Sequence, residues 1–140
     1  MRYLLDTNIL SELVRPQPDP GVVNWVLAHA DPLYHLSVVS LSELQFGISR
    51  LPPGQRRDRM QAWLAHDLSQ RFADRCLGVD EAVALCCGQL RADRQTQGEP
   101  LHVADGLIAA TAAVHDLVLV TRNVRDFVGL DLKLLNPFSE

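Results

Sequence analysis

Residues 2–8 read RYLLDTN, a short apolar run that ends in an acid, a hydroxyl and an amide. The apolar residues that follow have helical spacing, so the stretch predicts a buried strand that turns into a helix. Asp6 then stands at the carboxyl end of this strand. Open α/β sheets place their chemistry at that edge, because the loops that follow parallel strands meet there. The stretch therefore predicts an α/β fold with Asp6 in its functional site.

The other apolar segments alternate between strand-like and helix-like patterns along a chain of 140 residues. We expect a single domain over residues 1–140, because a chain of this length buries enough surface for one core. Strands are expected at 3–5, 33–39, 75–79, 117–120 and 132–135. Helices are expected up to residue 15, from 22 to 30, after residue 40, and at 55–72, 81–96 and 101–112.

The formal net charge of −4 is unusual for a protein that binds nucleic acid, because phosphate binders usually present a basic face. The sign alone does not exclude nucleic acid, because carboxylates that hold divalent cations count as negative while the cations are left out of the sum. Of the 13 basic residues all but Lys133 are arginines, which would contact phosphate with forked guanidinium groups. No leader and no membrane-length run is present, so we expect a cytoplasmic protein.

Three further acids follow apolar segments in the way that Asp6 does. Glu43 and Asp105 stand near the expected starts of helices, and Asp126 follows the strand at 117–120. In a parallel sheet with right-handed crossovers the carboxyl ends of all strands lie at one edge, so acids far apart in sequence would meet there. A bound cation would relieve their repulsion, and Mg²⁺ or Mn²⁺ suits oxygen ligands of this kind.

Two of these acids also have a purely structural interpretation. Ser40 and Glu43 have the spacing of a capping box, in which both side chains bind backbone N–H groups of their own helix. Asp105 would be stabilised in the first turn of its helix by the helix dipole. Beside it, Gly106 would let another group approach closely, and Gly47 would be explained by close helix packing.

A carboxylate site with a divalent cation would cleave phosphodiester bonds, because the metal activates a water and stabilises the leaving oxygen. Thr7 and Asn8 would orient Asp6, and Thr121 and Asn123 would support the last acid. The sequence has neither the glycine motif of dinucleotide-binding folds nor that of P-loops. Its histidines and cysteines show no ligand spacing, and we expect them on the surface or in the core.

Several segments together resemble one family. They are LLDTN (4–8), SVVSLSELQFG (37–47), ADGLIAATA (104–112), LVTRNVRDF (119–127) and NPF (136–138). They resemble the PIN-domain family, and within it most of all the ribonuclease toxins of bacterial VapBC and FitAB toxin–antitoxin pairs. The resemblance implies a three-layer fold with a central, mostly parallel sheet flanked by helices, and RNA cleavage that depends on Mg²⁺ or Mn²⁺. It also implies a homodimer, an antitoxin that blocks the acidic pocket, and a higher complex with antitoxin and operator DNA.

By position, Asp6, Glu43 and Asp105 match the metal-site acids of the family. The fourth position differs, because the family often has an acid where Asn123 stands, whereas Asp126 lies three residues further on. One firmly held metal ion is therefore expected.

The proposed substrate is RNA, in single-stranded or loop form. The alternative is a PIN-fold module that binds a partner and is catalytically silent. Arginines around the pocket would contact the RNA, and the candidates are Arg15, Arg50, Arg122 and Arg125.

Overall fold

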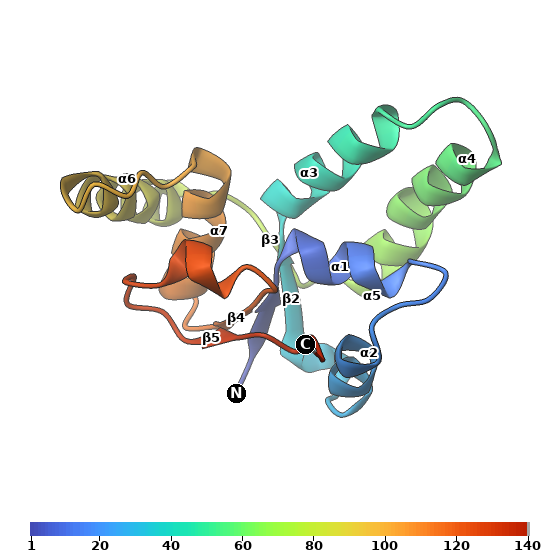
Figure 1. Cartoon of the computed structure of the whole chain (residues 1–140), viewed down its shortest axis with the longest axis horizontal. Helices are drawn as coiled ribbons and strands as arrows, with labels where there is room; N and C mark the ends of the chain where they lie inside the picture. The colour runs from blue at the N-terminus through green and yellow to red at the C-terminus, as the bar shows by residue number, and fades with distance from the viewer. Residues whose placement is uncertain (140) are drawn as a thin grey trace.

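The computed structural model describes residues 1–139 and places a parallel five-stranded sheet between two layers of helices (Figure 1). The strand order is β3-β2-β1-β4-β5, and each neighbouring pair is parallel. The predicted three-layer α/β fold is therefore confirmed. The strands are β1 (Tyr3–Leu5), β2 (Tyr34–Ser37), β3 (Cys76–Leu77), β4 (Val118–Val120) and β5 (Leu134–Leu135).

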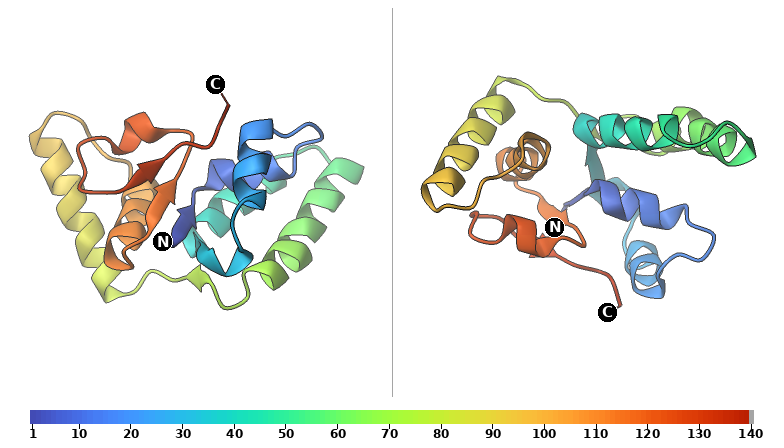
Figure 2. Two further views of the ribbon diagram at one scale, coloured as in Figure 1. Left: turned by 90° about the horizontal axis from the view of Figure 1, so that it is seen from below. Right: turned by 45° about the horizontal axis from the view of Figure 1, so that its top comes forward.

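Helices cover both faces of the sheet, with α6 and α7 on one side and the remaining α-helices on the other (Figures 1 and 2). Within residues 1–139, none of them is long and apolar enough to cross a membrane. The α-helices are α1 (Thr7–Leu13), α2 (Pro20–Leu27), α3 (Val38–Ser49), α4 (Gln55–Ala62), α5 (Ser69–Arg71), α6 (Glu81–Thr96) and α7 (Val103–Val114). A π-helical stretch, Trp63–Leu68, joins α4 to α5, and 3₁₀ turns η1 and η3 span Asp31–Leu33 and Val124–Phe127.

Strand β1 lies at the centre of the sheet and is buried on both faces. Tyr3 and Leu5 pack into the cluster with α1 and α2, whereas Leu4 packs into the cluster with α7. A strand of this kind has a continuous apolar sequence, which is why it can be recognised from the sequence. The backbone N–H of Asp6 donates to the carbonyl of Val120 at 2.9 Å. This bond fixes Asp6 beside the carboxyl end of β4.

The structure corrects two details near α3. Strand β2 is shorter than predicted, because Ser37 caps α3 by accepting a hydrogen bond from the N–H of Val39 at 3.0 Å. Ser40 therefore lies inside the helix, and the capping box with Glu43 is wrong. The packing explanation for Gly47 is also wrong, since a Cβ atom there would meet open space.

Helix α6 begins and ends where the sequence predicts. Asp80 caps it by accepting a hydrogen bond from the N–H of Val83 at 2.9 Å, and Gly98 follows its end with a φ of +77°. The predicted close approach at Gly106 is confirmed as well. A Cβ atom at Gly106 would lie 2.9 Å from the Sγ of Cys87 and 3.1 Å from the Cγ of Arg91, both on α6. The glycine therefore sets the distance between α6 and α7.

We expect Gly106→Ala to lower the free energy of unfolding by about 1–3 kcal/mol, because the added methyl group overpacks the contact between the helices. In an uncrowded helix the same change would stabilise the protein by about 1 kcal/mol. Urea unfolding at equilibrium measures the difference. In a Cys87→Ala background the sulfur is gone, so Gly106→Ala should cost less. An equal cost in both backgrounds would show that the clash is not the cause.

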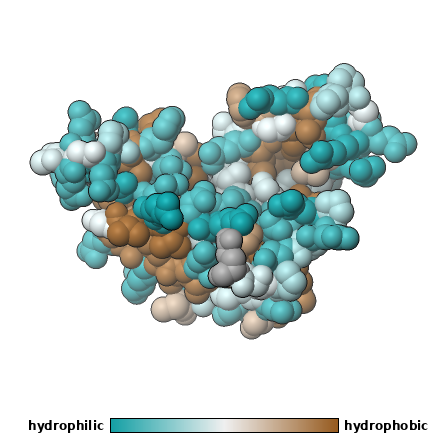
Figure 3. Space-filling view, viewed as in Figure 1, coloured by the Kyte–Doolittle hydropathy of each residue, from teal (hydrophilic) through white to brown (hydrophobic). Residues whose placement is uncertain are grey.

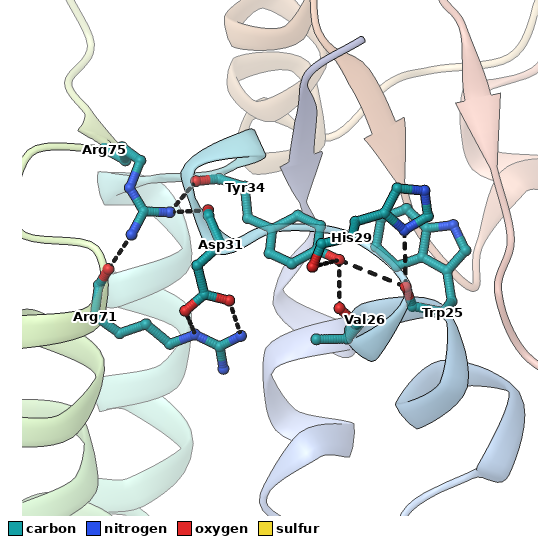
Figure 4. A network of polar contacts seen from close by, with 7 residues as sticks. All are labelled: Trp25, Val26, His29, Asp31, Tyr34, Arg71 and Arg75. Atoms are coloured by element: carbon teal, nitrogen blue, oxygen red, sulfur yellow. Dashed lines mark hydrogen bonds and ion pairs between the residues drawn. The ribbon is translucent and has the colours of Figure 1, made fainter.

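At the edge of the sheet where the strands begin, two arginines connect the segment before β3 to the start of β2 (Figure 4). Arg71 binds the carboxylate of Asp31 through two hydrogen bonds of 3.0 and 2.9 Å. Arg75 donates to the backbone carbonyls of Asp31, Tyr34 and Arg71. The hydroxyl of Tyr34 donates to the carbonyl of Val26 at 2.6 Å, which joins α2 to the same network.

Candidate functional site

Asp6 is buried, with an exposed fraction of 5%, and three neighbouring groups hold its carboxylate. Its Oδ1 accepts the backbone N–H of Thr7 at 2.8 Å, so the acid also caps α1. Its Oδ2 accepts the hydroxyl of Thr121 at 2.8 Å and the amide of Asn8 at 3.3 Å. The predicted role of Thr7 and Asn8 in orienting Asp6 is consistent with these contacts.

The electrostatic environment of Asp6 opposes its ionisation. The pKa of Asp6 is raised to about 6, first of all by burial and also by the charges of Asp105 and Glu43, against the hydrogen bonds from Thr121 and Thr7 that lower it. The carboxylate is still ionised at neutral pH, where its burial costs about 3 kcal/mol of stability. A cation at this position would remove that cost.

The loop that follows β4 is tied to Asp6 through a second set of bonds. The hydroxyl oxygen of Thr121 accepts the backbone N–H of Asn123 at 3.0 Å and the amide of Asn8 at 3.2 Å. The Oδ1 of Asn8 accepts the backbone N–H of Arg122 at 3.1 Å. The sequence predicts that Thr121 supports the last acid, whereas the structure places its hydroxyl on the first, Asp6.

Glu43 and Asp105 reach the same edge from two different helices. The hydroxyl of Thr7 donates to Oε1 of Glu43 at 2.6 Å and lies 2.9 Å from the Oγ of Ser40. The side chain of Glu43 therefore binds a residue of α1 and not the backbone of its own helix. Asp105 is half-buried in the first turn of α7. Burial raises its pKa, and the charges of Asp126 and Glu43 raise it further.

The charges of Asp105 and Glu43 thus act on Asp6, and those of Asp126 and Glu43 act on Asp105. These acids lie at the edge of the sheet where the lobe of α6 and α7 faces α3 (Figure 1). The surface is hollowed between these two parts, and hydrophilic residues dominate the rim (Figure 3). The side chains of Asp6 and Glu43 accept hydrogen bonds from hydroxyl and amide groups. A divalent cation bound there would balance the negative charge of the cluster.

The donor set fits a hard divalent cation, because all four side chains offer carboxylate oxygens. As the side chains of residues 1–139 now point, no three acidic, histidine or cysteine groups are close enough to hold a metal ion by themselves. The carboxylate of Glu43 is exposed, and Thr7, the residue that follows Asp6, binds it. Mg²⁺ usually keeps several waters and needs only one or two carboxylates, so the site can accommodate it.

Two of the four candidate arginines lie on the loop that carries Asp126. Arg122 and Arg125 line a pocket of about 420 Å³ together with Asn123, Val124 and Asp126. The other two have different partners. Arg15 pairs with Glu12 at 3.4 Å, and the guanidinium of Arg50 lies 5.2 Å from the ring centre of Phe46.

A family model for the PIN domain matches residues 3–131. The chain belongs to the PIN-domain family. This PIN domain is 36% identical over 137 residues to Toxin FitB of Neisseria gonorrhoeae, an alignment that covers 98% of this chain and 99% of the relative. It is 35% identical over 136 residues to VapC ribonuclease Y4jK of Sinorhizobium fredii, and the alignment covers 97% of each.

The fold of this PIN domain also matches a solved structure, that of FitAB bound to an IR36 DNA fragment. The TM-score is 0.90 at 35% identity, and the match covers 96% of this chain and 94% of that chain. The full-length relatives are therefore toxins of the VapC and FitB kind, and the resemblance inferred from the sequence motifs is confirmed.

Proposed function

We propose that this PIN domain is a metal-dependent endoribonuclease and the toxin of a toxin–antitoxin pair. One observation carries the proposal: carboxylates from separate segments lie close enough at one sheet edge to raise the pKa values of Asp6 and Asp105. A relative named as a VapC ribonuclease, similar over almost the whole chain, supports RNA as the substrate.

Asp6, Glu43 and Asp105 would hold one Mg²⁺ or Mn²⁺ ion, and Asp126 would complete the site. A divalent cation bound there makes water a stronger nucleophile and stabilises the charge that develops on the phosphodiester. Thr121 and Asn8 keep Asp6 in one orientation, and Thr7 holds Glu43 within reach of it. Asn123 would place the loop between Thr121 and Asp126 through its backbone N–H. The arginines of that loop, Arg122 and Arg125, would contact RNA phosphates.

The partners follow from the relatives. FitAB was solved as a complex on DNA, and Toxin FitB is the relative of this chain within that pair. We therefore propose that the chain forms a homodimer, binds an antitoxin that covers the acidic site, and joins it on operator DNA.

The direct test is RNA cleavage by the purified protein, free of any antitoxin, over a range of Mg²⁺ and Mn²⁺ concentrations. Cleavage should need the metal, stop with EDTA and return when metal is added. Asp105→Asn, purified in parallel, should be folded and inactive, which excludes a contaminating nuclease. The absence of cleavage by wild-type protein at every metal concentration would instead support a catalytically silent module that only binds a partner.

A further inference from the structure

Arg94 on α6 is a buried cation that the proposed site does not use directly. Its exposed fraction is 6%, although arginine is almost never fully buried without a partner. The nearest carboxylate is that of Glu99, whose Oε2 lies 3.9 Å from Nη2 of Arg94 and whose side chain is 69% exposed. The main partners of the guanidinium are instead backbone carbonyls.

These carbonyls belong to two segments next to acids of the site. One is the loop that leads into α7, which carries Asp105, and the other is the turn η3 with Asp126. Nε of Arg94 donates to the carbonyl of Glu99 at 3.1 Å, in the loop that leads into α7 and Asp105. Nη1 donates to the carbonyl of Asp126 at 3.0 Å and approaches that of Val128 at 3.5 Å. One guanidinium therefore joins the loop before α7 to the 3₁₀ turn η3.

The turn η3 is anchored in the core by one large side chain. The side chain of Phe127 is fully buried against the layer of α7, whereas Asp126 and Val128 on either side of it are exposed. The buried ring fixes the depth of the turn. The bonds from Arg94 to carbonyls on both sides of Phe127 hold the backbone of the turn at a second point. They therefore fix the backbone position from which the side chain of Asp126 extends.

A buried arginine is a costly way to stabilise a fold, because an apolar residue of similar volume is often as stabilising or more so. A planar fork with fixed donors is suited to holding several acceptors in one geometry. We infer that Arg94 is a positioning residue that sets Asp126 against Asp105, so that the two carboxylates can bind one divalent cation. This inference rests on the proposed function for the role of the cation.

The test compares Arg94→Lys with Arg75→Lys. Arg75 also donates to three backbone carbonyls, but at the amino edge of the sheet, away from the acids (Figure 4). Both changes keep the charge and remove the fork, so both should lower stability. Only Arg94→Lys should weaken Mn²⁺ binding, measured by calorimetry, and we expect about 10–100-fold, the usual effect of losing an outer-shell partner. The values of kcat and KM for RNA cleavage are measured on the same samples.

The background variant Asp126→Asn separates positioning from general loosening. If Arg94 acts through Asp126, then Arg94→Lys should have little further effect on Mn²⁺ affinity once Asp126 is changed. If Arg94→Lys weakened Mn²⁺ binding by the same factor with and without Asp126→Asn, the inference would be overturned. Equal losses of Mn²⁺ affinity in Arg94→Lys and Arg75→Lys would also overturn it. Arg94→Gln, which keeps one donor without the buried charge, gives the same test if the lysine variant does not fold.

Hydrogen exchange distinguishes failure of this inference from failure of the proposed function. If wild-type protein neither binds Mn²⁺ nor cleaves RNA, the proposed function is wrong. The positioning role still predicts that Arg94→Lys speeds exchange of the amides of Glu99, 101–103 and 124–128, while those of β1 and α1 stay protected. Unchanged exchange in both segments would overturn the inference whatever the activity.

Discussion

Asp6→Asn is expected to stabilise the metal-free protein at pH 8 and to abolish RNA cleavage. The folded protein holds the pKa of Asp6 at about 6, above the ordinary value of 3.8. Between pH 3.8 and about pH 6 the folded state binds more protons than the unfolded state, so the free energy of unfolding falls as pH rises through this range. Above pH 6 the ionised side chain of Asp6 lowers the free energy of unfolding by about 3 kcal/mol. The neutral side chain of asparagine has no such cost.

The expected gain in the free energy of unfolding at pH 8 is therefore up to about 3 kcal/mol, and it should shrink towards pH 4. Urea unfolding at several pH values in EDTA measures it. Cleavage should fall by more than about 100-fold, since a ligand matters more than the outer-shell partners that cost 10–100-fold. An Asp6→Asn protein that is active, or that is less stable at pH 8 than wild type, would contradict the account.

Asp19→Asn is the matched control, because Asp19 caps α2 as Asp6 caps α1, and asparagine is an equally good cap. The hydrogen bonds from Ser139, first of all that of its hydroxyl, hold the pKa of Asp19 below its ordinary value. Its ionised form is therefore favoured by folding. Asp19→Asn should therefore lower the free energy of unfolding at pH 8, whereas Asp6→Asn should raise it. The control should keep full cleavage activity.

Thr121→Val should reduce cleavage at pH 7 by about 10–100-fold, as expected for the outer-shell partner of a ligand. The lost hydroxyl is the largest influence that lowers the pKa of Asp6, so this pKa should rise further. A protonated carboxyl does not bind a cation. The acid limb of the pH–rate profile should therefore move to higher pH, and activity should recover partly at pH 8.5 to 9.

Thr121→Ser keeps the hydroxyl and should retain both the rate and the position of the acid limb. The comparison separates the bond to Asp6 from the packing of a fully buried side chain. Equal pH profiles for the valine variant and the wild type would show that Thr121 does not tune Asp6.

Much of the fold could be predicted from the sequence because its elements have strong local signals. The three residues before Asp6 are all apolar or aromatic, as expected of a strand buried on both faces, and α6 spans the predicted residues 81–96. The placing of Asp6 and Glu43 follows from topology, since both come after parallel strands whose carboxyl ends lie at one edge. Asp105 lies on α7, which follows α6 with no strand between them, so the same rule does not account for its position. The capping box failed because a serine three residues earlier, Ser37, takes the same role.

The support of the site could not be predicted, because it depends on contacts between distant segments. Thr121 meets Asp6 across 115 positions of sequence, and Thr7 meets Glu43 across 36. The sequence marks both threonines as supporting residues because they follow acids or strands, but it does not show that Thr121 binds Asp6 or that Thr7 binds Glu43. Arg94 looks like one more polar residue on an amphipathic helix, and only the structure shows that it is buried.

The central claim is that Asp6 and Asp105 share one divalent cation. A crystal structure of the protein soaked in Mn²⁺, with the anomalous signal of manganese, tests it most directly. The account predicts one strong peak in contact with the carboxylates of Asp6 and Asp105, directly or through a shared water, and its loss in Asp6→Asn. Manganese bound elsewhere, with both carboxylates bare at pH 8, would contradict it.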